Sequence, residues 1–160
     1  MPNKIVDGFN HAFGIKGFDY DEINTEIFIG TNMCCQFGFH KELIDKGVRA
    51  DISLEYERID APMGVDYFLW LPTVDQQAPS QDKLNLGAQT LKFLLNRKVK
   101  VYIHCKNGHG RAPTLFAAYL ISTGLSVKEA VAQIKSKRPA THLTRAQLAA
   151  LTLFQKSVRK

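Results

Sequence analysis

The feature that most constrains the fold of this chain is a strand that runs directly into a helix through a short, glycine-containing loop. Lys100 to His104 is an apolar, β-branched and aromatic run that predicts a buried strand. Cys105 to Gly110 then leads to a helix, in whose first turn Pro113 misses no hydrogen bond. Gly108 and Gly110 let the loop amides point inward. The segment therefore predicts an anion cradle at the carboxyl end of a strand.

Short apolar runs alternate with helical patterns along the rest of the chain. Three more runs predict strands, namely Ile27 to Ile29, Ala50 to Tyr56 and Tyr67 to Leu71. Helices are predicted over Phe39 to Lys46, from Ser80 to about Arg97, after Pro113, and after the capping-box pairs Ser126/Glu129 and Thr144/Gln147. This order predicts an α/β sandwich, with functional loops at the carboxyl ends of the strands.

Length, composition and charge set limits without selecting a function. The 160 residues fit one domain, 1–160, and a formal net charge of +6 favours anionic partners. Much of this charge lies near the C-terminus, where a solvated helix face is expected for Lys135, Lys137, Arg138, Arg145, Lys156, Arg159 and Lys160. With no signal peptide, no membrane-spanning run and only three cysteines, a cytoplasmic, monomeric protein without a stable nucleic-acid partner is expected.

Cys105 and Arg111 carry the chemistry that the cradle predicts. A thiol at a helix N-terminus beside cations loses its proton readily, so Cys105 is expected to be a thiolate at neutral pH. The guanidinium of Arg111, six positions later, can hold two phosphoryl oxygens at once. A buried structural cysteine beside a surface arginine is the simpler alternative.

Cys105, five intervening residues and Arg111, preceded by His104, resemble the signature loop of the protein tyrosine and dual-specificity phosphatase superfamily. The chain looks like a small bacterial or archaeal dual-specificity-like enzyme. This resemblance implies a cysteine-phosphatase-like sandwich with a mainly parallel sheet of about four to five strands flanked by helices. It also implies a two-step reaction through a phosphocysteine intermediate, without a metal or other cofactor.

The resemblance also implies a general acid on a loop before the cysteine. Asp75 follows a predicted strand and lies 30 residues before Cys105, so it is the candidate. An ordinary turn aspartate is the alternative at this position. Asp66 and Asp82 are weaker substitutes.

The other residues of the loop and its flanks are assigned supporting roles. The substrate phosphate is expected to contact the loop residues Lys106, Asn107, Gly108, His109, Gly110 and Arg111. His104 is expected to orient the loop rather than act as a base. Ala112 stands where the superfamily usually has a serine or threonine whose hydroxyl assists departure of the cysteine sulfur, so the second step is expected to be slow or to use Thr114.

Cys34 and Cys35 have three possible roles. Core filling is favoured, a redox disulfide between one of them and Cys105 stays open, and zinc ligation together with His40 is disfavoured because adjacent cysteines depart from the usual ligand spacing.

The functional prediction is a phosphatase for phosphotyrosine, and for phosphoserine or phosphothreonine if the cleft is shallow. The expected partner is thus a phosphorylated protein or another anionic phosphomonoester. One alternative is a phosphatase for phosphoinositides, phospholipid head groups or RNA 5′-phosphates, indicated by Lys106 and His109. The other is a non-catalytic phosphate-binding module, indicated by Ala112.

Overall fold

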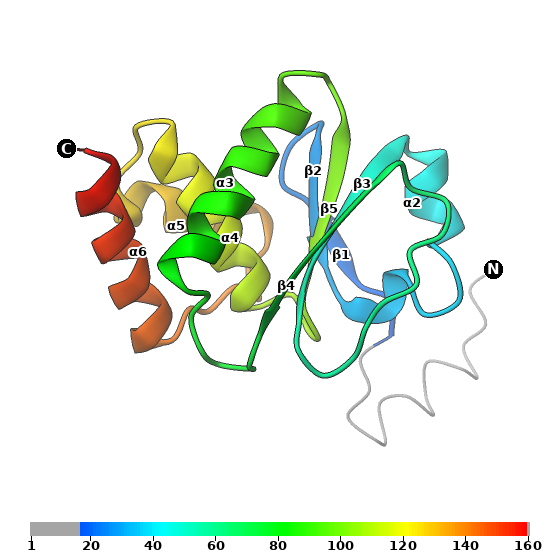
Figure 1. Ribbon diagram of the computed structural model, residues 1–160, viewed down its shortest axis with the longest axis horizontal. Coiled ribbons are helices and arrows are strands. Elements are labelled where there is room, and N and C mark those ends of the chain that lie inside the picture. Colours follow the sequence, from blue (N-terminus) through cyan, green and yellow to red (C-terminus); the bar gives the residue numbers. More distant parts are fainter. Residues whose placement is uncertain (1–16, 160) are drawn as a thin grey trace.

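A single five-stranded sheet forms the centre of the protein (Figure 1). The computed structural model describes residues 17–159. The strand order is β1-β2-β5-β3-β4, and only β1 runs antiparallel to its neighbour. The predicted, mainly parallel sheet is therefore confirmed. Its strands are β1 (Tyr20–Glu22), β2 (Ile27–Gly30), β3 (Val48–Glu55), β4 (Tyr67–Thr73) and β5 (Lys100–His104).

Helices cover both faces of this sheet unequally, as Figure 1 shows. One face carries α3 (Gln81–Leu95), α4 (Arg111–Ser122), α5 (Val127–Lys137) and α6 (Arg145–Val158). Within residues 17–159, the other face carries only α2 (Lys41–Asp45) and a short 3-10 helix, η1 (Asn32–Cys34). Ten of the twelve residues of α4 are buried, because this helix lies between the sheet and the other large helices.

The alternation of side chains along β5 creates a separate core on each face. Val101 and Ile103 pack into the large apolar cluster beneath α3 and α4. Tyr102 belongs to a smaller cluster beneath α2, and His104, two residues further, faces the same way. Successive residues of one strand thus serve two different environments.

The helix starts follow the predicted caps. Both capping boxes form, at Ser126 with Glu129 and at Thr144 with Gln147, and Ser80 caps α3. The helix predicted over residues 39–46 is shorter than expected, because the His40 side chain accepts from the Glu42 amide and the helix proper begins at Lys41. The short elements β1 and η1 were missed, since three residues cannot show a period.

One prediction about the C-terminal charges is wrong. Arg138 does not lie on a solvated helix face but is fully buried, and its guanidinium pairs with Asp19 and Asp21 at 3.0 and 2.7 Å. Lys160 and residues 1–16 lie outside the described part. No helix within residues 17–159 is long and apolar enough to cross a membrane.

Candidate active site

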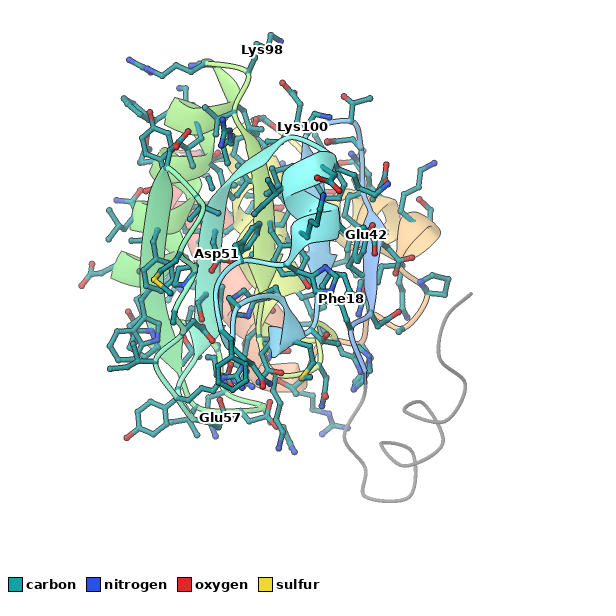
Figure 2. The ribbon with its side chains drawn as sticks, turned by 90° about the vertical axis from the view of Figure 1, so that its right-hand side faces the viewer. Phe18, Glu42, Asp51, Glu57, Lys98 and Lys100 are labelled. Atoms are coloured by element: carbon teal, nitrogen blue, oxygen red, sulfur yellow. The ribbon has the colours of Figure 1, made fainter. Side chains whose placement is uncertain are left out.

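The carboxyl ends of three parallel strands bring the candidate site together. Cys105 directly follows β5 and is only 3% exposed, while Glu57 and Asp75 follow β3 and β4. In Figure 2, Glu57 lies at the end of the sheet opposite Lys98 and Lys100, which precede and begin β5. This is the edge at which parallel α/β sheets bind ligands.

The loop after Cys105 depends on Gly108. Its φ is +67°, and an added Cβ would lie 2.4 Å from the carbonyl oxygen of Gly30 in β2. Both the left-handed conformation and the close approach therefore require glycine. Gly110 is less constrained, since an added Cβ there would lie 3.1 Å from the side-chain amide of Gln147.

Hydrogen bonds from outside the loop orient its peptide groups. Arg138 donates from Nε to the Gly108 carbonyl at 2.8 Å and from Nη2 to the Asn107 carbonyl at 3.2 Å. The Asn32 amide donates to the Lys106 carbonyl at 3.3 Å. In a trans peptide the carbonyl and the following N–H point in opposite directions. The next amides, those of residues 107, 108 and 109, therefore face away from these donors, as an anion cradle requires.

Arg111 is a fully buried cation held by groups from two other strand ends. Its Nη1 donates to Glu57 Oε2 at 3.0 Å and to the Thr73 carbonyl at 2.7 Å, and Nη2 donates to Glu57 Oε1 at 3.2 Å. Asp75 Oδ1 lies 3.1 Å from Nη2. Arg111 Nε has no hydrogen-bond partner in the described structure. The guanidinium is thus anchored on one side by a two-point contact with Glu57.

This pairing shifts the pKa values of both partners. Partial burial acts to raise the pKa of Glu57, but the hydrogen bond and charge of Arg111 together with backbone hydrogen bonds outweigh it, and the pKa is lowered. Burial acts to lower the pKa of Arg111, but Glu57 and the nearby charges of Cys105 and Asp75 raise it. Arg111 remains charged and Glu57 remains ionised at neutral pH.

A polar cavity of about 370 Å³ opens above the loop. It is lined by Asp75, Gln76, Cys105, Asn107, His109, Gly110, His142, Thr144 and Gln147. The Asp75 side chain is 52% exposed and reaches both this cavity and Arg111. Asp66 lies before β4, pairing with Arg49 at 3.8 Å, and Asp82 lies in the first turn of α3. Asp75 is therefore the aspartate that the structure brings to the cavity.

The remaining predicted residues lie around the loop. Lys106 is exposed, and the ring of His109 lies 5.4 Å from that of His142. His104 is buried beneath the loop on the α2 side of the sheet. Burial acts to lower its pKa, but the neighbouring Asp51 carboxylate raises the pKa well above the usual value. His104 thus supports the loop from below and does not enter the cavity.

The predicted help from Thr114 is not what the structure shows. The Thr114 hydroxyl donates to the Gly110 carbonyl at 2.7 Å, one helical turn earlier. Its hydrogen is therefore already engaged in a hydrogen bond at the start of α4. Ala112 is fully buried and offers only a methyl group.

Sequence reasoning missed Glu57 and Arg138 as residues that build the site. Glu57 follows the carboxyl end of a strand, as Asp75 does, and that position was the available signal. No local sequence pattern marks Arg138 as a residue of the site, because the loop carbonyls that it contacts are about 30 residues away in sequence. Gln147 was assigned to capping alone; it caps α6, but it also lines the cavity and donates to the Gln77 carbonyl.

Comparison with known proteins assigns the family. Residues 32–125 match the family model described as "Polymorphic toxin system, DSP-PTPase phosphatase". This match covers more than half of the chain. The chain belongs to this family. It is thereby a member of the protein tyrosine and dual-specificity phosphatase superfamily.

Individual relatives agree with this assignment. The human "Phosphatidylglycerophosphatase and protein-tyrosine phosphatase 1" is 37% identical over 108 residues, which are 66% of this chain and 51% of that protein. The crystal structure of PTPMT1 superposes with a TM-score of 0.74 at 30% identity, covering 88% of this chain and 96% of the other. PTPMT1 in complex with PI(5)P gives 0.75 at 28% identity, with the same coverage. The chain spans about half the length of the curated relatives it matches.

The Glu57–Arg111 pair predicts a pH-dependent contribution to stability. Because the folded pKa of Glu57 lies below its ordinary value of 4.5, the pair stabilises the fold above about pH 4.5. That contribution is lost as the pH falls through the folded pKa. Since the Glu57 side chain is 35% exposed, we expect Glu57→Gln to cost about 1 kcal/mol at pH 7 after solvent screening.

Urea denaturation at pH 7 and at pH 3.5 measures this difference. The gap between the unaltered protein and Glu57→Gln should narrow at the lower pH. A gap that is equal at both pH values would show that Glu57 contributes through packing rather than through its charge.

Proposed function

We propose that this chain hydrolyses phosphate monoesters by a two-step, cysteine-dependent reaction at the cavity above residues 105–110. The observation that carries the proposal is the convergence of Cys105, the loop amides and the buried Arg111 at one end of the sheet. A phosphoryl group seated there would meet a nucleophile from below and positive charge around its oxygens.

In the first step, the Cys105 thiolate attacks phosphorus and the bond from phosphorus to the leaving oxygen breaks. Asp75, as a carboxylic acid, gives its proton to that oxygen, so an alcohol departs rather than an alkoxide. The loop amides and Arg111 stabilise the equatorial oxygens. The product of this step is phosphocysteine at residue 105.

In the second step, water attacks the phosphorus of phosphocysteine. The Asp75 carboxylate takes a proton from this water, the phosphorus–sulfur bond breaks, and the thiolate and inorganic phosphate are released. Ala112 supplies no hydroxyl to the departing sulfur, and the Thr114 hydroxyl is engaged by Gly110. We therefore expect this step to limit the rate.

The contact between Asp75 and Arg111 supports a change of partner on substrate binding. Asp75 Oδ1 contacts Arg111 Nη2, a donor that a bound phosphoryl group would also use. A bound phosphate would displace this half-exposed carboxylate toward the leaving group, while Glu57 keeps Arg111 in place. The amides and Arg111 supply the positive charge for phosphoryl transfer, so the chemistry requires no metal or other cofactor.

The first candidate substrate is a phosphotyrosyl protein. The cavity of about 370 Å³ is within the size range of small-molecule sites and can admit a phosphorylated aromatic side chain. One domain over residues 1–160 would carry this reaction, since Cys105, Arg111, Asp75 and Glu57 all lie at one end of the same sheet.

The second candidate is a phosphorylated lipid head group. The names of the human relative and of the PTPMT1 complex mention phosphatidylglycerophosphatase activity and PI(5)P, respectively. In this chain, the exposed Lys106 and the His109–His142 pair would add positive or hydrogen-bonding groups beside the cavity.

Two aspartate variants and one cysteine variant test the mechanism. Cys105→Ser should abolish phosphate release in metal-free, reducing buffer, because it removes the nucleophile. Asp75→Asn should lower kcat/KM, which reports the first step, by about 10²–10⁴-fold with an alkyl phosphate, whose leaving group needs protonation. The loss should be smaller with para-nitrophenyl phosphate, whose leaving group is more acidic.

Asp82→Asn is the matched control, because this exposed aspartate lies in α3 away from the cavity lining. It should retain the activity of the unaltered protein. An inert unaltered protein that still binds phosphopeptide would instead support the non-catalytic binding module. Equal losses with both substrates would exclude Asp75 as the general acid.

A substrate panel separates the two candidates. We expect turnover of phosphotyrosyl peptide, measured as kcat/KM, to exceed that of phosphoserine peptide, a phosphoinositide and a 5′-phosphorylated RNA. A phosphoinositide or phosphatidylglycerophosphate cleaved at least tenfold faster than the phosphotyrosyl peptide would establish the lipid candidate in its place.

A further inference from the structure

A second cluster of reactive side chains lies on the face of the sheet opposite α4. Cys34 and Cys35 come from η1 and the residue after it, Asp51 comes from β3, and His104 ends β5. All four are buried, and one ligand atom from each lies within 4.8 Å of every other. The mechanism above uses none of the first three residues.

The spacing of these atoms fits a tetrahedral metal site. Cys35 Sγ lies 3.5 Å from His104 Nε2, and Asp51 Oδ1 lies 3.3 Å from the same nitrogen. Zinc–ligand bonds of about 2.0–2.3 Å, taken at tetrahedral angles, give sulfur–nitrogen and nitrogen–oxygen edges of about 3.5 and about 3.4 Å. These two separations match the expected edges, and the remaining ligand atoms lie within 4.8 Å of one another, so the cluster has the dimensions of a site for one ion.

Asp51 gives an independent reason to expect a ligand. Its side chain is fully buried, and neither carboxylate oxygen has a hydrogen-bond partner among the described residues. Its Oδ1 lies 3.3 Å from His104 Nε2, as an ion pair. His104 is the charged neighbour of Asp51, but a buried carboxylate whose oxygens accept no hydrogen bond is costly, and coordination to a cation would satisfy it.

We propose that Cys34, Cys35, Asp51 and His104 bind one Zn²⁺ ion. Two thiolates, one imidazole and one carboxylate are ligand types that zinc accepts in tetrahedral sites. The thiols must lose their protons on binding, so zinc uptake at neutral pH releases protons.

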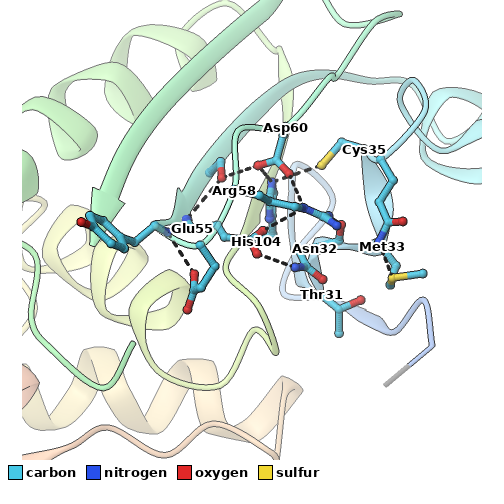
Figure 3. Close-up of polar contacts among 12 residues, drawn as sticks. Thr31, Asn32, Met33, Cys35, Glu55, Arg58, Asp60 and His104 are labelled. Atoms are coloured by element: carbon cyan, nitrogen blue, oxygen red, sulfur yellow. Dashed lines mark hydrogen bonds and ion pairs between the residues drawn. The ribbon is translucent and has the colours of Figure 1, made fainter. Parts of the chain in front are cut away.

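A second possible ligand set, Glu55, Asp60 and His104, shares the histidine, and both of its carboxylates have hydrogen-bond donors or an arginine beside them. Asp60 accepts from Ser53 Oγ at 2.6 Å and from Arg58 Nε at 3.3 Å, and Glu55 Oε1 accepts from Asn32 at 2.6 Å. Figure 3 shows Cys35 and Asp60 approaching His104 together with this network. Glu55 Oε2 has no hydrogen-bond partner among the described residues, but it lies 3.5 Å from Arg58 Nε, whereas neither oxygen of Asp51 has a hydrogen-bond partner. An ion on the thiol side would therefore satisfy more unpaired groups.

The sequence pointed to the wrong histidine for such a site. His40 is near the two cysteines in sequence, but its ring stacks on Phe18 at 3.8 Å and its Nδ1 caps α2. His104 is 69 residues from Cys35, and the sheet brings it there. The adjacent cysteines are compatible with one ion because both side chains are buried against β3 and β5.

Such an ion would be a structural clamp beneath the catalytic loop. It would join η1 and β3 to the residue that directly precedes Cys105. Because His104 faces away from the cavity, the ion would not contact the substrate.

Metal analysis of the unaltered protein tests the proposal. We expect about one equivalent of zinc after refolding with Zn²⁺ in reducing buffer and desalting. Cobalt should replace it, giving thiolate-to-cobalt charge-transfer bands and the intense visible bands of tetrahedral coordination. X-ray absorption should give sulfur neighbours at about 2.3 Å. These readouts need no variant and no activity.

Variants then assign the ligands. Asp51→Asn and Cys35→Ser should each weaken zinc binding by at least about 10–100-fold, the loss seen when only an outer-shell partner is removed. Cys105→Ser and His40→Ala, which change a cysteine and a histidine outside the cluster, should retain the ion and the cobalt spectrum.

The contrary outcomes are distinct. An unaltered protein with no stoichiometric zinc and no cobalt–thiolate bands would overturn the proposal and leave a buried ion pair. So would a Cys34–Cys35 disulfide that persists in reducing buffer, or loss of the ion in Cys105→Ser. Phosphatase activity could persist in each case, so failure here would not test the proposed function.

Discussion

The buried guanidinium of Arg111 is the interaction on which the site depends. A fully buried cation is costly without partners, and here the partners come from the ends of β3 and β4 while the arginine itself opens α4. Three segments far apart in sequence must therefore meet at one edge of the sheet. The group that holds these segments together is also the cation that the proposed reaction uses for the phosphoryl oxygens, so stability and the proposed phosphate binding share one side chain.

The conformation of the loop between β5 and α4 is fixed by contacts on two sides. Inside, Gly108 takes a left-handed conformation against the Gly30 carbonyl, which no larger residue could approach. Outside, Arg138 engages two loop carbonyls and is balanced by Asp19 and Asp21. A preorganised cradle results, and its amides need little reorganisation when an anion binds.

Local pattern predicted much of this structure. The strand over Lys100–His104 and both capping boxes follow from periodicity and cap residues, whereas Asp75 was selected through the family resemblance. Glu57 and Arg138 were missed because their partners are distant in sequence. For the same reason Cys34 and Cys35 could not be linked to Asp51, which lies in a different strand from His104. Which residues of neighbouring strands lie side by side depends on the register of the sheet. The sequence of a single strand does not reveal that register.

The central claim is that Cys105 carries the phosphoryl group between the two steps. The most direct measurement is rapid acid quenching of the protein during turnover of an aryl phosphate, followed by mass spectrometry of its peptides. The account predicts one phosphoryl group on the peptide that contains Cys105, at a substantial fraction of the protein because Ala112 slows the second step. Turnover with no phosphorylated peptide, or with phosphate on a residue other than Cys105, would contradict it.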